Sequence, residues 1–123
     1  MKKILFYFHV SIIFSSILLA QDISSGIKLI KHEKLNEAKK TFNSLLNGKS
    51  KAEAYFYLGE IYFIEEKVDS AKVLYKKGIE ADIDFPLNYA GMVRLNVLEG
   101  NDSEIAKNRN QAIDLGEDNP KVY

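Results

Sequence analysis

The sequence has no cysteine, no tryptophan and only two histidines among its 123 residues. Without cysteine the chain cannot form a disulfide bond, which is the usual support of small exported domains. Its fold must therefore be held together by an apolar core alone. The chain is long enough for one domain with such a core, especially if its helices are stacked.

The sequence also lacks an excess of either charge, because 17 basic residues balance 17 acidic ones. A nucleic-acid surface needs a basic stripe, and a membrane-surface patch needs clustered basic residues, so this balance argues against both. Seven tyrosines, seven phenylalanines and an apolar content of 46% exclude an intrinsically disordered chain. The composition therefore predicts a single folded domain.

The N-terminus has the form of a secretory signal peptide. Two lysines after Met1 precede a mostly apolar run over residues 4–19, and Ala20 comes before polar residues. This predicts a signal peptide over 1–20 and a mature domain over 21–123, in the periplasm or secreted. The run is short for a membrane span, and no cysteine follows it, so a lipoprotein is excluded. The alternative is an uncleaved segment that tethers the domain to the membrane.

Residues 52–85 have the most regular pattern in the chain. In their first half, aromatic, apolar and small residues stand at i, i+3, i+4 and i+7, and in their second half they stand at i, i+4 and i+7. Each set forms one stripe along a helix, as on amphipathic helices. A polar break at residues 65–67 has the length of a tight connection between two helices. Small residues would let the helix backbones approach, and aromatic rings would fill the space beside them. The two stripes are Tyr55, Leu58, Gly59 and Tyr62, then Ala71, Tyr75 and Gly78.

This pattern resembles the tetratricopeptide repeat, a helix–turn–helix unit of about 34 residues with the signature W-x2-L-G-x2-Y and then A-x3-F. Tyr55 stands at the tryptophan position and Tyr75 at the phenylalanine position. The resemblance implies a solenoid in which the first helix of each unit lines a concave, partner-binding side. Any amphipathic helical hairpin would show one pair of stripes, but recurrence of the pattern favours the repeat.

The stretch before the central unit repeats it in part. Residues 22–51 form a degenerate first unit, in which Ala38 and Phe42 match Ala71 and Tyr75 at a period of 33. The aromatic anchor of its first helix is missing, as is expected of a terminal repeat.

The stretch after the central unit, residues 86–119, forms a third unit at a period of 34. Tyr89 repeats the first aromatic anchor, and Ala112 repeats the small residue at position 78. Ile113 gives the second helix of this unit part of an apolar face. Asn96 and Arg109 stand where the other two aromatics would be repeated, so this unit is expected to pack less tightly.

These observations predict an all-α chain, an α-solenoid of three tandem helix–turn–helix repeats with no strand. The expected helices lie near residues 22–32, 35–47, 52–66, 69–81, 87–99 and 103–115.

The last residues, 120–123, have the pattern of the start of a fourth unit, since Tyr123 follows Tyr89 by the same interval that separates Tyr89 from Tyr55. This suggests a chain that is cut short. Under that alternative the repeats are an N-terminal accessory domain of a longer protein, which could be an enzyme.

No combination of residues indicates catalysis or a metal site. His32-Glu33 begins a near match to the H-E-x-x-H zinc motif, but Asn36 replaces the second histidine. The glycines are scattered and form no phosphate-binding loop, and no serine, histidine and aspartate are placed as a triad. We therefore expect no enzyme activity, no cofactor and no metal.

The remaining candidate site is a surface. On the first helices of the second and third units, some residues miss the core stripe and would face the concave side. A peptide or partner helix could bind there, which makes a protein–protein interaction scaffold of the bacterial cell envelope the predicted function. The expected groove residues are Phe56, Glu60, Phe63, Arg94 and Val97.

Overall fold

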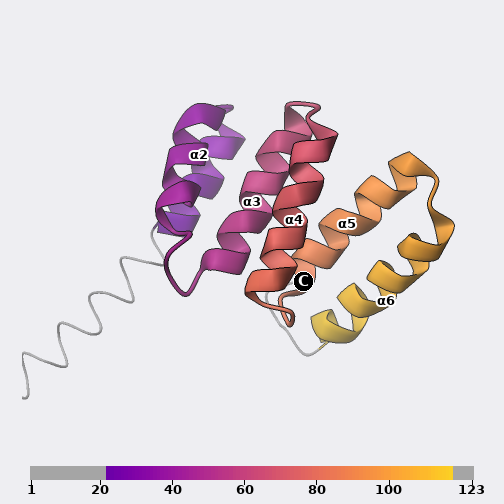
Figure 1. Cartoon of the computed structure of the whole chain (residues 1–123). Coiled ribbons are helices and arrows are strands. Elements are labelled where there is room, and N and C mark those ends of the chain that lie inside the picture. The colour runs from indigo at the N-terminus through magenta and orange to yellow at the C-terminus, as the bar shows by residue number, and fades with distance from the viewer. Residues whose placement is uncertain (1–21, 118–123) are drawn as a thin grey trace, which may run out of the picture.

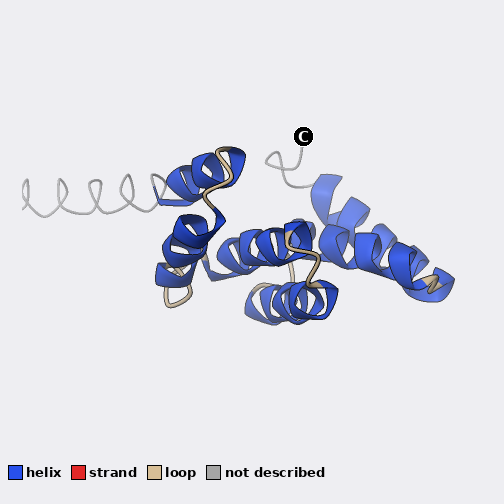
Figure 2. Ribbon diagram, turned by 90° about the horizontal axis from the view of Figure 1, so that it is seen from above, coloured by secondary structure: helices blue, strands red, loops and turns tan. Residues whose placement is uncertain are grey.

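The computed structural model describes residues 22–117, and all regular secondary structure in that range is helical (Figure 2). A first helix covers residues 22–31. It is followed by α2 (Leu35–Ser44), α3 (Lys51–Ile64), α4 (Val68–Ala81), α5 (Pro86–Glu99) and α6 (Asp102–Glu117). The prediction of an all-α chain is confirmed, and each helix begins and ends close to its predicted bounds. The predicted signal peptide, 1–20, and the C-terminal segment 120–123 lie outside the described residues.

The helices follow one another across the molecule in chain order (Figure 1). The closest pairs are α3 with α4 and α5 with α6, each an antiparallel hairpin. The backbone of α3 also lies close to those of α2 and α5, and that of α4 lies close to α5, whereas the backbones of α2, α4 and α6 do not come close to one another. As a result, α3 and α5 lie against each other on one side, and the second helices are spread apart on the other.

The turn inside each hairpin has the same backbone structure. Glu33, Glu66 and Gly100 occupy it with left-handed φ angles of 59°, 61° and 67°. After α3, the Glu66 N–H donates to Phe63 O and the Lys67 N–H donates to Tyr62 O, both at 2.9 Å. The same pair of bonds follows the first helix and α5. These are Schellman motifs, which satisfy carbonyl groups at the end of a helix.

The left-handed turns allow a prediction about stability. Glycine adopts this conformation without steric cost, whereas other L-residues pay about 1–2 kcal/mol. We therefore expect Glu66→Gly to raise the free energy of unfolding by about 0.5–1 kcal/mol, after the larger entropy of glycine in the unfolded chain is subtracted. Gly100→Ala should lower it by a similar amount. Urea melts of the two variants would measure these changes, and a destabilising Glu66→Gly would contradict the assigned strain.

The core is built from aromatic rings that lie directly on glycines. The Phe42 ring of α2 occupies the space beside Gly26, and the Tyr75 ring of α4 occupies the space beside Gly59 of α3. A Cβ atom on either glycine would overlap the ring, and both rings are fully buried. The two ring-on-glycine contacts therefore recur with a spacing of 33 residues, from Gly26 to Gly59 and from Phe42 to Tyr75.

The opposite faces of these two rings are covered differently. Phe42 stacks on Tyr57 of α3, with ring centroids 5.1 Å apart. Tyr75 instead meets a second glycine, Gly91 of α5, which leaves its ring between two helix backbones. Because Gly91 follows Tyr57 by one repeat period, the same position in two successive hairpins supplies a ring in one and no side chain in the other.

The third hairpin has a more polar interior than the others. In α6 the only buried residues are Asn108 and Gly116, and Arg109 is exposed. On α5, Asn96 is buried at 2% exposure. The placing of Ile113 on an apolar face needs correction, because it is 49% exposed and the buried positions of α6 are Asn108 and Gly116 instead. The weaker packing expected of this unit agrees with the lack of a buried aromatic ring in α6.

Candidate interaction surface on α3 and α5

The five predicted groove residues lie on two helices that contact each other. Phe56, Glu60 and Phe63 come from α3, and Arg94 and Val97 come from α5. Glu60 and Phe63 precede Arg94 and Val97 by one repeat period each, so they occupy equivalent turns of neighbouring hairpins.

Two side chains of this surface, Glu60 and Arg94, meet at the hydroxyl group of Tyr75. That hydroxyl donates to Glu60 Oε1 at 2.6 Å, and Arg94 Nη2 donates to the tyrosine oxygen at 2.7 Å. Arg94 also forms an ion pair and hydrogen bonds with the Glu60 carboxylate, and its guanidinium lies 4.1 Å from the ring centroid of Phe63. The cluster joins α3, α4 and α5, and it satisfies a phenol group that would otherwise be buried without a partner.

Burial, together with the hydrogen bond and the charge of Glu60, raises the pKa of Tyr75 well above its ordinary value. The folded protein therefore keeps the phenolic proton at a pH where the unfolded chain loses it. Above about pH 10 the unfolded state binds fewer protons, so stability falls as pH rises, while below that pH the contribution is complete.

This linkage predicts the behaviour of Tyr75→Phe. The variant should lose about 1.5–3 kcal/mol at neutral pH, as expected for a hydrogen bond to a charged group. Above about pH 10 its stability should fall less steeply than that of the wild type. Denaturant melts from about pH 8 to pH 11 would measure both slopes, and every ionisable group other than Tyr75 is present in both proteins. If stability falls equally steeply with pH in the two proteins, Tyr75 is not the group that causes the fall.

The two aromatic groove residues are closer to the core than the sequence indicated. Phe56 and Phe63 are half-buried and pack against the core cluster that contains Tyr75. The ring centroid of Phe56 is 6.1 Å from that of Tyr75. The expectation that they miss the core therefore needs correction.

Most of the residues that were predicted to pack the repeats are buried in the structure. Those that are buried are Ala38, Phe42, Leu58, Gly59, Ala71, Tyr75, Gly78 and Tyr89. The remaining three, Tyr55, Tyr62 and Ala112, are half-buried. Gly78 differs from its expected role, because it makes room for the side chain of Asn88 rather than for a helix backbone.

Three large apolar side chains of this part of the molecule are exposed to solvent. Ile64 is 52% exposed at the end of α3, and Val97 and Leu98 are 58% and 63% exposed at the end of α5. Ile64 and Leu98 occupy equivalent positions, one repeat period apart. We call these three residues the apolar ridge.

A groove that the sequence did not indicate lies on the other side of α3, between α2 and α4. It holds about 270 Å³ and is lined by Asn43, Leu58, Tyr62, Ser70, Val73 and Leu74.

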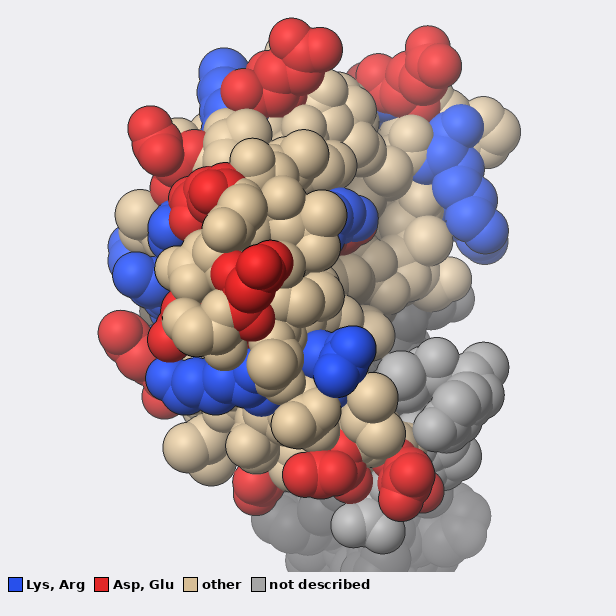
Figure 3. Space-filling view, turned by 90° about the vertical axis from the view of Figure 1, so that its right-hand side faces the viewer, with Lys and Arg blue, Asp and Glu red and all other residues tan. Residues whose placement is uncertain are grey.

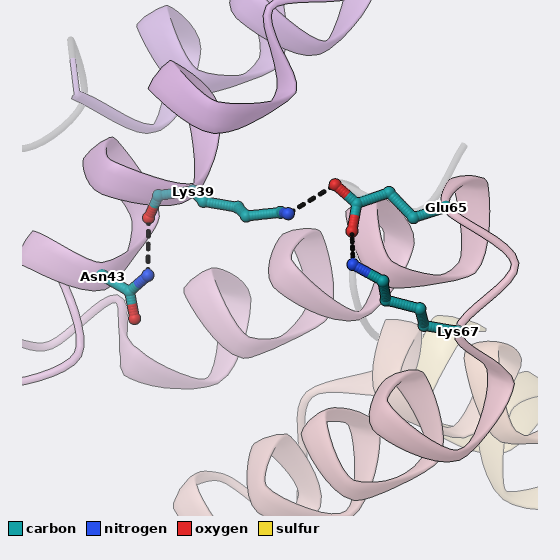
Figure 4. Close-up of polar contacts among 4 residues, drawn as sticks. All are labelled: Lys39, Asn43, Glu65 and Lys67. Atoms are coloured by element: carbon teal, nitrogen blue, oxygen red, sulfur yellow. Dashed lines mark hydrogen bonds and ion pairs between the residues drawn. The ribbon is translucent and has the colours of Figure 1, made fainter.

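Near Tyr62 of this groove, Glu65 is bound by both Lys39 and Lys67 (Figure 4). The two ammonium groups also lie 4.9 and 5.6 Å from the ring centroid of Tyr62. Hydrogen bonds from these lysines lower the pKa of the Glu65 carboxyl group. Sequence periodicity cannot reveal this groove, because it results from the separation of α2 and α4.

Charged side chains of both signs are interspersed over the face at the α5–α6 end (Figure 3). Among residues 22–117, no three His, Asp or Glu side chains are grouped closely enough to hold a metal ion. None of the helices in the described part of the chain combines the length and hydrophobicity needed to cross a bilayer. His32, from the near match to a zinc motif, is exposed in the first turn.

Comparison with protein-family models and with curated proteins gave no match for this chain.

Proposed function

We propose that this protein is a tetratricopeptide-like solenoid of three hairpins, exported to the periplasm or cell surface, that binds a segment of a partner protein on its α3–α5 side. The repeat interpretation is supported by the three left-handed turns, at Glu33, Glu66 and Gly100, which follow one another at the repeat period. It is also supported by the two ring-on-glycine contacts, which recur at the same period. Export is supported by the sequence of residues 1–20.

The apolar ridge is the observation that carries the binding function. Exposed apolar side chains scattered singly are ordinary, but here two of the three are at repeated positions on helices that contact each other. Buried between partners, such side chains are typical anchors of an interface. The hydrogen bonds and ion pair among Glu60, Arg94 and Tyr75 join α3 to α5, so the surface is already formed before a partner arrives.

The test is capture of a partner from an envelope extract by the immobilised protein. We expect a captured protein that binds the wild type and is lost from the double variant Val97→Ser/Leu98→Ser. The matched control is Val73→Ser/Ile113→Ser, which removes two side chains that are 52% and 49% exposed elsewhere. All four residues are exposed, so thermal melts should change little. Equal capture by both double variants would contradict the proposed surface.

A further inference from the structure

We infer that the partner segment bound at the apolar ridge is basic, an amphipathic stretch with lysine or arginine beside its apolar residues. This inference rests on the proposed function and specifies the chemistry of its partner. The ridge lies at one end of the hairpins, beside the α3–α4 and α5–α6 turns. We call residues 64–69 and 97–104 together the acidic edge.

The two turns belong to one continuous surface. Lys72, in the first turns of α4, forms an ion pair at 2.7 Å with Glu99 at the end of α5. Arg94 reaches from α5 to the Phe63 ring and to Glu60 on α3. The end of each hairpin is therefore linked to its neighbour, and one peptide can contact both.

Most of the basic side chains in or beside the acidic edge are paired with carboxylates. Lys72 is paired with Glu99, Lys107 lies 3.7 Å from Glu104, and the Lys39–Glu65–Lys67 cluster keeps one excess positive charge. Against this, three exposed carboxylates make no ion pair with any described residue. They are Glu66, Asp69 and Asp102. The edge therefore has net negative charge beside exposed apolar side chains, which is complementary to a basic amphipathic segment.

A structural role explains only part of this charge. Asp69 and Asp102 lie in the first turns of α4 and α6, where a carboxylate is favourable to the helix dipole. Glu66 has no such role, and it holds a left-handed conformation that glycine adopts in the equivalent turn after α5. The corresponding turn after the first helix has no negative excess, because Lys31 and Lys34 flank Glu33.

The test uses three fluorescein-labelled peptides that share one helical pattern of leucines. All their remaining positions are lysine in the first peptide, glutamine in the second and glutamate in the third. Fluorescence anisotropy would measure their binding to the full chain. The lysine peptide should bind tightest, and its affinity should fall as salt is added. Ile64→Ser/Leu98→Ser should weaken it about tenfold.

Charge variants separate the inference from the proposed function. The triple variant Glu66→Gln/Asp69→Asn/Asp102→Asn should weaken the lysine peptide several-fold and leave the glutamine peptide unchanged. Its matched control, Glu80→Gln/Asp114→Asn/Glu117→Gln, neutralises three exposed carboxylates near the other ends of α4 and α6 and should have no effect. If all three peptides bind equally and depend on Ile64 and Leu98, the basic partner is refuted and the binding function stands. If the loss of Ile64 and Leu98 changes nothing, both are refuted.

Discussion

Tyr75→Ala should lower the free energy of unfolding by about 3–5 kcal/mol, the cost of removing a large buried aromatic side chain. The ring is fully buried between Gly59 and Gly91, and no neighbouring side chain lies between it and these backbones. The resulting cavity would therefore be bounded by two helix backbones, which cannot collapse easily. The change also removes a hydrogen-bonding partner from Glu60 and Arg94.

Lys76→Ala is the control for this prediction. Lys76 follows Tyr75 on α4 and is exposed, so its loss should change stability by no more than about 0.5 kcal/mol. Denaturant melts of the two variants would measure the difference. Similar values would mean that the face of α4 assigned to the core is wrong.

Gly59→Ala is expected to destabilise the protein by about 1–3 kcal/mol, although alanine is the better helix former. Helix propensity alone predicts a gain of about 1 kcal/mol in the middle of α3. However, a Cβ atom at this position would overlap three atoms of the Tyr75 ring. Because the ring also rests on Gly91, it cannot move away, so the steric term should dominate.

A second glycine provides the comparison. Gly48 lies in the loop before α3, and a Cβ atom there would have only an ordinary contact, 3.6 Å from Leu45 O. Gly48→Ala should therefore be neutral within about 0.5 kcal/mol. Thermal melts of both variants would test this, and a stabilising Gly59→Ala would show that the Tyr75 ring moves to make room for the added methyl group.

The sequence predicted the helices well because their signals are local. Apolar spacing defined each helix, and polar breaks such as residues 65–67 defined the turns. The Gly59–Tyr75 contact could be anticipated because both residues belong to one predicted helical hairpin. The same reasoning predicted that Phe42 packs in the first hairpin as Tyr75 does in the second.

Contacts between units could not be predicted in this way. Tyr57 and Gly91 occupy equivalent positions of α3 and α5, and each meets the core ring of the preceding hairpin. The predicted core stripe does not select this position, because periodicity assigns a residue to a face of its helix but does not show which neighbouring helix that face meets. The hydrogen bonds of Tyr75 with Glu60 and Arg94 have no signal in the sequence for the same reason, although each of the three residues can be selected individually.

The polar interior of the third hairpin was only partly predicted. Asn96 and Arg109 are recognisable departures from the pattern, and Arg109 is exposed as a charged residue should be. The burial of Asn108, one position earlier, was not expected. Its amide group donates to Glu104 O at 2.9 Å within the same helix, so it needs no partner from α5, and sequence gives no signal for that arrangement.

The order of the helices in space has a consequence for how the chain folds. Each labelled helix contacts only the next helix or the next but one along the sequence. Domains with such short-range topology have low contact order and fold rapidly, since little loop entropy is lost before favourable contacts form. Among the labelled helices, the α3–α4 pair has the most extensive contacts, and it contains the ring-on-glycine contact of Tyr75 with Gly59. We therefore expect this hairpin to be the folding nucleus, from which ordered structure spreads in both directions along the chain.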